Sequence, residues 1–219
     1  MNRSSSRQST TRSRVHELDW INMLQILTPL ALFAFVSSIT PGPNNIMLTS
    51  SGILHGFVRS IPHMLGICIG FGVLLALCAA GVGSLVLAVP QIHLLLKICG
   101  SLYLLYLAWQ LRSMAFSHSE NQESRPMSLL GAALFQFANP KAWVMAVTGA
   151  SAFLPIMQPM WLATTVFCLV FCTVNLPCIG VWAGTGAALR RHLAEPKWQR
   201  VFCALMVALT VYSAVSVWL

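Results

Sequence analysis

Residues 40–45 read Thr-Pro-Gly-Pro-Asn-Asn, and they lie inside an apolar segment that is long enough to cross a lipid bilayer. Proline and glycine interrupt a helix, because proline lacks an N–H group and glycine weakens helical backbone. In hydrocarbon, unpaired amides and carbonyls are so costly that a break is tolerated only where protein or a watery cavity satisfies it. Asn44 and Asn45 supply donors and acceptors at that place. The stretch therefore predicts either a proline kink packed by asparagines or a binding site on a broken helix, as in secondary transporters.

The composition is that of a membrane protein. Of the 219 residues, 57% are hydrophobic and 8% are charged, whereas a soluble domain carries roughly 25% charged residues. The net charge of +8 does not indicate nucleic-acid binding, because the basic residues lie mostly in loops and a tail, where lipid headgroups and insertion rules explain them. The seven cysteines lie in apolar segments without zinc-ligand spacing. We therefore expect an all-α polytopic membrane protein in a lipid bilayer, without a metal or other cofactor.

Apolar runs predict six spans, at residues 24–50, 61–89, 92–111, 127–153, 160–186 and 201–219. Polar loops are expected at residues 51–60 and 187–200. The polar stretch 112–126 divides the chain into two halves of three spans, residues 23–111 and 127–219. Residues 1–22 are rich in Ser and Arg, which predicts a disordered tail, or a biological start at Met23.

The two halves share a pattern. The fourth span is interrupted by Asn139-Pro140-Lys141, as the first is by residues 40–45. The second span of each half also carries a Gly-x-x-x-Gly motif, first at Gly66 and Gly70 and then at Gly180 and Gly184. An odd number of spans per half gives the halves opposite orientations. Interrupted segments at corresponding positions of inverted repeats point to a transporter site, and half-helix N-termini suit a substrate carboxylate. The glycines serve close packing within the chain or a homodimer face.

Orientation follows from the basic residues of the loops. The loops that contain Arg59, residues 112–125 and residues 190–200 fall on one side of the six spans, and the opposite loops carry no Lys or Arg. The positive-inside rule places these loops in the cytoplasm and both termini in the periplasm. The Arg-rich tail argues against this orientation unless Met23 is the start.

These motifs resemble those of the LysE/RhtB family of bacterial amino-acid exporters. Residues 40–45 resemble its signature, residues 139–143 (Asn-Pro-Lys-Ala-Trp) its second motif, and Lys97-x-x-Gly100-x-x-Tyr103-Leu104-x-x-Leu107 its third-span pattern. The resemblance implies an inner-membrane exporter of amino acids or close derivatives, driven by the proton gradient. Many members have Asp where this chain has Asn44. The Asn-Asn form resembles the branch of cysteine and O-acetylserine exporters, while threonine- or homoserine-like substrates stay open.

The candidate residues fall into two groups. The predicted substrate-binding residues belong to the two breaks: Pro41, Gly42, Pro43, Asn44, Asn45, Asn139, Pro140 and Lys141. Lys141 either pairs with a substrate carboxylate, satisfies carbonyls freed by Pro140, or extends to the interface. The candidates for cavity lining or proton coupling are His63, Lys97, Gln136, Tyr103 and Asn175. All five acids lie outside the predicted spans, so His63 is a candidate proton carrier, although a packed histidine is the plainer interpretation.

Three other functions compete with amino-acid export. A metal-ion exporter needs oxygen ligands for hard cations, and the predicted spans of this chain contain no carboxylate. A membrane enzyme needs a nucleophile with a base or a metal set, and the spans offer neither. A non-transporting assembly subunit would leave the paired breaks without a purpose. The leading hypothesis predicts that Asn45→Ala abolishes transport while the protein still inserts.

Overall fold

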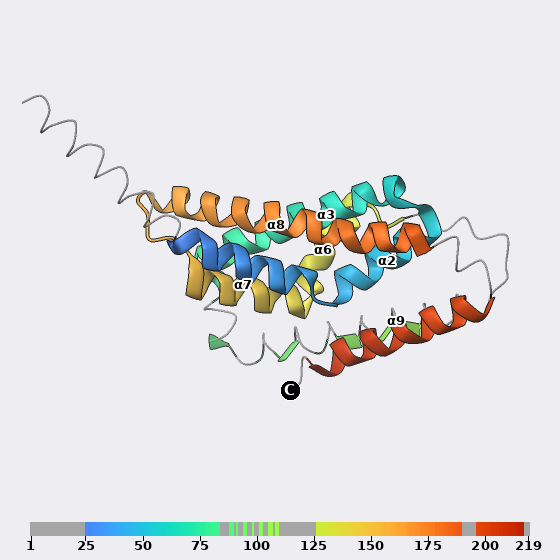
Figure 1. Ribbon diagram of the computed structural model, residues 1–219. Coiled ribbons are helices and arrows are strands. Elements are labelled where there is room, and N and C mark those ends of the chain that lie inside the picture. Colours follow the sequence, from blue (N-terminus) through green and yellow to red (C-terminus); the bar gives the residue numbers. More distant parts are fainter. Residues whose placement is uncertain are drawn as a thin grey trace, which may run out of the picture.

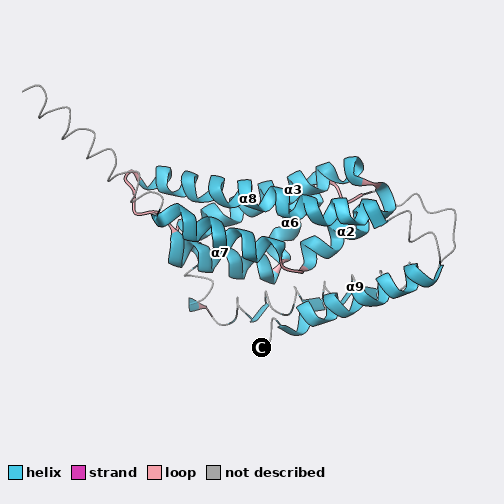
Figure 2. Cartoon of the chain, viewed as in Figure 1, coloured by secondary structure: helices cyan, strands magenta, loops and turns pink. Residues whose placement is uncertain are grey.

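The computed structural model describes residues 25–83, 126–189 and 196–216, together with scattered positions between 88 and 109. These residues form helices joined by short loops (Figures 1 and 2). The helices are Gln25–Ile39, α2 (Pro43–His55), α3 (Phe57–Ala79), α6 (Leu129–Ala138), α7 (Pro140–Phe153), α8 (Met160–Leu189) and α9 (Pro196–Ser216). By length and composition α3 and α8 can each cross a membrane, and the bent pair Gln25–Ile39 and α2 forms a third candidate span within the described residues. The arrangement of six spans stays a prediction.

Both predicted breaks are present. The first separates Gln25–Ile39 from α2 with a bend of 56°, and the second separates α6 from α7 at Asn139. In each case the following helix begins with a proline. Proline is favoured at a first helical position, where its missing N–H would have no partner in any case.

The predicted loop at residues 51–60 is wrong. Helix α2 continues to His55 and α3 begins at Phe57, so Gly56 alone separates them, with a φ of 83° that favours glycine. Ser51 and Ser60, the first and last residues of that predicted loop, are buried and hydrogen-bond to each other at 2.7 Å. The predicted loop at 187–200 is likewise shorter, because α8 extends to Leu189 and α9 starts at Pro196.

Glycines allow two helix pairs to approach closely. A Cβ on Gly66 or Gly70 of α3 would lie 2.2–2.3 Å from backbone oxygens of α6, so this motif serves packing within the chain. On α8 the close approach is at Gly186, where a Cβ would lie 2.1 Å from the carbonyl oxygen of Thr49 on α2. The predicted pair Gly180 and Gly184 contacts only side chains of α3.

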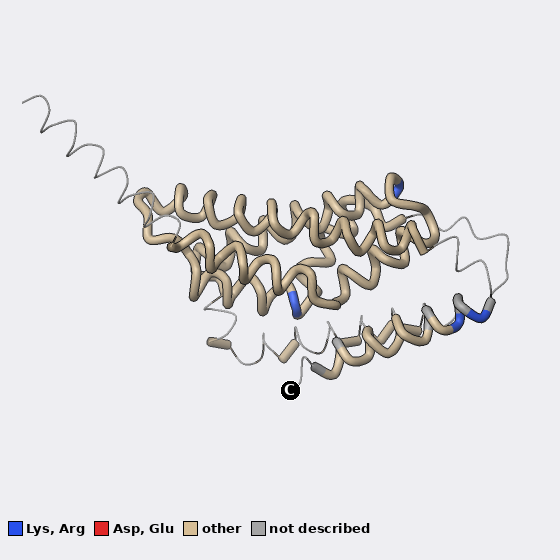
Figure 3. Tube along the Cα trace, viewed as in Figure 1, with Lys and Arg blue, Asp and Glu red and all other residues tan. Residues whose placement is uncertain are grey.

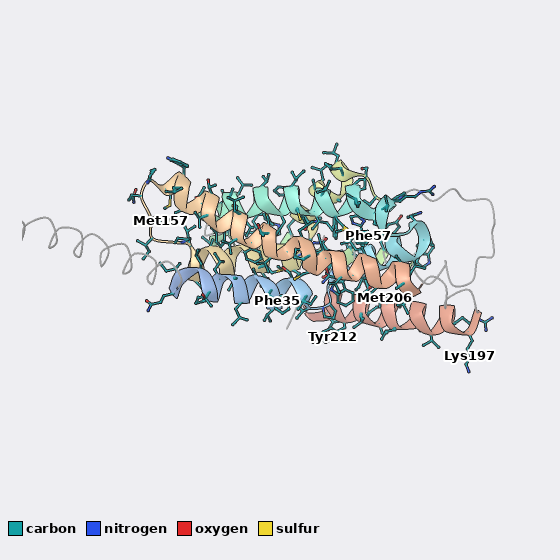
Figure 4. All side chains as sticks on the ribbon, turned by 45° about the horizontal axis from the view of Figure 1, so that its top comes forward. Phe35, Phe57, Met157, Lys197, Met206 and Tyr212 are labelled. Atoms are coloured by element: carbon teal, nitrogen blue, oxygen red, sulfur yellow. The ribbon has the colours of Figure 1, made fainter. Side chains whose placement is uncertain are left out.

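Aromatic rings fill the centre of the bundle, whereas apolar side chains also cover its outside. Phe171 of α8 packs edge-to-face against Phe33, Phe71 and Phe167. On the outer surface, Phe35 is 50% exposed and Tyr212 on α9 is 68% exposed (Figure 4). An apolar exterior around a packed core is the surface expected of helices that face lipid.

Helix α9 lies along one side of the bundle (Figure 1), where Met206 packs against Ile46 of α2. Ser101, one of the scattered described residues of the predicted third span, donates to the carbonyl oxygen of Ala214 on α9 at 3.4 Å. This contact places Ser101 beside α9.

Candidate functional site

The side chain of Asn45 stabilises the first break by hydrogen-bonding to its carbonyl groups. Gly42 precedes α2 in an extended conformation (φ −174°), and no side chain of the described residues caps the start of α2. The amide nitrogen Nδ2 of Asn45 donates to the carbonyl oxygens of Ser38 and Thr40, both at 2.8 Å. Asn45 is 3% exposed, so its side chain supplies to these carbonyls the donors that a continuous helix would have given.

The second break is a capped helix start. Asn139, buried between α6 and α7, accepts a hydrogen bond at Oδ1 from the backbone N–H of Lys141 at 3.1 Å. An asparagine in this role is among the favoured helix N-caps. The indole Nε1 of Trp143 donates to the carbonyl oxygen of Phe137 at 2.9 Å, which satisfies a carbonyl at the end of α6.

Two side-chain contacts join the breaks. The Lys141 ammonium donates to Thr40 O at 2.8 Å, Thr40 Oγ1 at 2.9 Å and Pro41 O at 3.2 Å. Asn44 and Gln136 exchange a reciprocal amide pair, at 2.8 and 3.1 Å. Lys141 therefore satisfies carbonyls of the first break rather than those freed by Pro140.

The absence of a side chain at Gly42 makes the lysine contact possible. A Cβ there would lie 2.7 Å from Lys141 Cδ and 2.9 Å from Nζ. A lysine at the centre of a span costs about 2.5–3.5 kcal/mol, while a hydrogen bond to a charged group contributes about 1.5–3 kcal/mol. Three such bonds are enough to hold the ammonium at the break.

A small cavity of about 20 Å³ lies where the breaks meet, which is room for about one water molecule. The lining combines both breaks with α3 and α8: Ser37, Ser38, Gly42, Pro43, Asn44, Asn45, Phe71, Asn139, Lys141, Ala142, Met145, Asn175 and Ile179.

The electrostatics of the cavity favour an anion. Lys141 is its one charged lining residue, and the residues that the structure describes include no Asp or Glu. The N-termini of α2 and α7 also face this region with their positive dipole ends. In Figure 3 the basic residues of the described chain lie at the start of α7 and at the end of the bundle where α3 and α9 begin.

The predicted site residues divide into several groups. Most break residues line the cavity, and so does Asn175, whose Nδ2 lies 3.9 Å from Cys68 Sγ. Pro41 and Gln136 contribute through their bonds to Lys141 and Asn44, and Pro140 begins α7. Lys97 and Tyr103 lie outside the described residues.

His63 lies in α3 away from the cavity lining. It is 1% exposed, and both of its ring nitrogens are buried without a hydrogen-bond partner among the described residues. Buried polar atoms are almost always paired in folded proteins, so this histidine calls for a functional or structural reason.

Sequence reasoning missed several residues of the site. Ser38 and Thr40 were assigned only to the first span. The feature that could have identified them as site residues is their polarity directly before the prolines. Phe71, Met145 and Ile179 line the cavity with apolar side chains that nothing in the sequence distinguishes from core residues.

Two broken helices that meet at a polar cavity inside an apolar bundle are the architecture of a secondary membrane transporter. Residues 35–218 match the family described as LysE type translocator, and the chain belongs to this family. The resemblance drawn from the motifs is thereby confirmed.

The curated relatives are efflux proteins. The cysteine/O-acetylserine efflux protein of Salmonella choleraesuis (strain SC-B67) is 32% identical over 201 residues, which cover 87% of this chain and 99% of that protein. The proteins of the same name from Shigella flexneri serotype 5b and Escherichia coli O157:H7 are each 31% identical over the same shares. No solved structure matches the chain.

Proposed function

We propose that this protein exports small neutral amino acids, of the kind of cysteine or O-acetylserine, across the bacterial inner membrane. The observation that carries the proposal is the meeting of two broken helices around one lysine, in a chain whose curated relatives are named cysteine/O-acetylserine efflux proteins. The alternatives of a metal-ion exporter and of a non-transporting subunit are not favoured by that family membership.

The substrate carboxylate would bind between Lys141 and the start of α2. Among the described residues no side chain caps α2, so the backbone N–H groups of Asn44 and Asn45 are well placed for an anion. The cavity holds one cation and no acidic residue, so a substrate with an additional positive charge, such as lysine, meets repulsion. This electrostatic balance supports a neutral substrate.

The halves 23–111 and 127–219 would be inverted repeats. Equivalent pairs of helices are in contact: α2 packs against α8, and α7 packs against α3. Among the described residues, the Lys and Arg residues of α3 and α9 lie at the end of the bundle where these helices begin (Figure 3), and we assign this end to the cytoplasm by the positive-inside rule.

Protons would drive export, and His63 is our candidate carrier. An imidazole changes charge near neutral pH, and among the described residues no carboxylate offers an alternative. The unpaired ring nitrogens of His63 are consistent with a group that exchanges a proton during transport.

Counterflow in proteoliposomes tests the proposal. Vesicles are loaded with a mixed unlabelled pool, and labelled cysteine, O-acetylserine, threonine, leucine or lysine is added outside one at a time. We expect a neutral amino acid to accumulate, lysine to stay out, and Lys141→Met to lose the accumulation. Arg59→Gln, which removes an exposed charge at the start of α3, is the matched control. Folded protein without accumulation of any label would overturn amino-acid export.

A further inference from the structure

The Lys141 ammonium is bound entirely by neutral oxygens of the first break. Its acceptors are the carbonyl and hydroxyl oxygens of Thr40 and the carbonyl oxygen of Pro41. A lysine ammonium has three N–H donors, and three oxygens receive it. The α-ammonium of an amino acid is the same chemical group with the same three donors.

The two Thr40 oxygens are held in place without the lysine. Asn45 Nδ2 donates to Thr40 O at 2.8 Å, so that carbonyl keeps one bond when Lys141 leaves. Thr40 Oγ1 itself donates to Ser37 O at 2.9 Å, which fixes the orientation of the hydroxyl. The oxygen cluster is thus a formed ammonium site that an internal side chain fills in this structure.

We infer, on the basis of the proposed function, that the oxygens of Thr40 and Pro41 are the subsite for the substrate's α-ammonium and that Lys141 blocks it as an internal mimic. A substrate carboxylate draws the Lys141 ammonium away from these oxygens. The substrate's own ammonium then takes the three acceptors, and its carboxylate binds Lys141. Every donor that loses a partner gains another one, so the exchange leaves no buried charge unpaired.

This arrangement explains why the cavity is small and what would open it. With Lys141 bonded across the breaks, the space is about 20 Å³, and release of Lys141 from the Thr40 and Pro41 oxygens enlarges it. Only a molecule that carries both an ammonium and a carboxylate on one carbon atom, as an α-amino acid does, replaces both halves of the contact. The protein then recognises the ammonium and the carboxylate of the substrate, and the substrate side chain contacts the apolar part of the lining.

Competition binding to the purified full chain in detergent tests the inference. The probe is labelled cysteine under reducing conditions, and the competitors are cysteine, N-acetylcysteine, cysteine methyl ester and cysteamine. In the wild-type protein only cysteine should compete well. Loss of either charged group should weaken competition roughly tenfold or more, the factor expected when a hydrogen bond to a charged group is lost.

The decisive variant is Lys141→Met, in which the oxygen site is free. Cysteamine and the methyl ester, which keep the ammonium but lack the carboxylate, should now bind directly, and each should raise the thermal unfolding temperature of this variant. Gly42→Ala provides a second route, because the new Cβ would displace the Lys141 side chain from the Thr40 and Pro41 oxygens. The extended backbone of residue 42 is one that alanine adopts without strain. Arg59→Gln should leave the wild-type rank order unchanged.

The outcomes separate this inference from the proposed function. If N-acetylcysteine competes as well as cysteine in the wild-type protein, or if neither variant gains binding of the carboxylate-free amines, the ammonium subsite is wrong. If binding follows the predicted order but counterflow is absent, amino-acid export fails and the subsite stands. If folded wild-type protein binds no amino acid, both are overturned.

Discussion

The two breaks differ in what holds them together. Residues 40–42 separate the helices of the first break. Three side chains donate to its carbonyl groups: Asn45 to Ser38 O, Lys141 to Thr40 O, and Trp182 of α8 to Ile39 O. The second break is the single residue Asn139, which caps α7 within its own segment.

This difference assigns separate roles to the breaks. A break that is closed by local contacts keeps its shape when the rest of the protein moves, so the second break is a rigid support that presents Lys141. A break whose carbonyls depend on a side chain 101 residues away can exchange that partner for a substrate group. The first break is therefore the part of the site that responds to substrate.

The largest expected effect is that of Asn45→Ala compared with Asn139→Ala. The first removes two donations, to the buried carbonyl of Ser38 and the partly buried carbonyl of Thr40, at about 1–3 kcal/mol each, and should abolish counterflow. The second removes one N-cap, worth about 1 kcal/mol, and should leave most of the transport. Thermal unfolding in detergent measures the stability difference, and Asn45→Asp, which keeps the shape without the amide donor, should behave like Asn45→Ala. Equal unfolding temperatures for Asn45→Ala and Asn139→Ala would remove the distinction between the breaks.

Helix α2 also depends on its crossing with α8. Gly186→Ala should displace α2, because the new Cβ would lie 2.1 Å from Thr49 O, and the yield of folded protein and counterflow should both fall. Gly184→Ala is the matched control, since its Cβ would lie 3.9 Å from the nearest atom, on Phe57, and a tolerated substitution changes stability by about 0.5 kcal/mol or less. A stable and active Gly186→Ala protein would contradict the close crossing.

His63→Gln separates proton coupling from substrate binding at the breaks. Because His63 does not line the cavity, we expect the variant to retain counterflow, which requires no net proton movement. Accumulation driven by an imposed pH gradient should be lost. Transport assays with and without the gradient measure the two activities in the same vesicles. Full gradient-driven accumulation in the variant would exclude His63 as the carrier.

The smallest expected effects are those of two tryptophans. Trp182→Phe removes the bond to Ile39 O at the first break, and Trp143→Phe removes the bond to Phe137 O at the second. Each should lower the free energy of unfolding by about 1 kcal/mol. Initial counterflow rates should decrease only for Trp182→Phe. An equal decrease in both variants would show that the second break also moves during transport.

Local chemistry made the breaks predictable, whereas the contacts between them were not. Proline and glycine in apolar spans predicted both interruptions, and an asparagine directly before Pro140 is a recognisable cap. The bonds of Asn44 with Gln136 and of Lys141 with Thr40 join residues 92 and 101 positions apart. Such pairs follow from how helices cross, and no local pattern carries that information.

The predicted loop at residues 51–60 was wrong for the same reason. Ser51 and Ser60, its first and last residues, are each other's hydrogen-bond partner across a tight helix connection. Helix α8 approaches α2 most closely at Gly186, whereas a Cβ on Gly180 or Gly184 of the predicted pair would meet side chains of α3. Composition indicates which residues can pack closely, and the three-dimensional arrangement decides which of them do.

The most direct test of the account is amide hydrogen exchange at the two breaks, measured by mass spectrometry with and without saturating cysteine. The account predicts that substrate slows exchange in peptides that contain residues 40–45, where the start of α2 binds the carboxylate. Peptides that contain residues 139–143 should exchange at the same rate in both conditions, because the second break is capped by Asn139. Protection at the second break with none at the first would contradict the assignment of substrate binding to the first break.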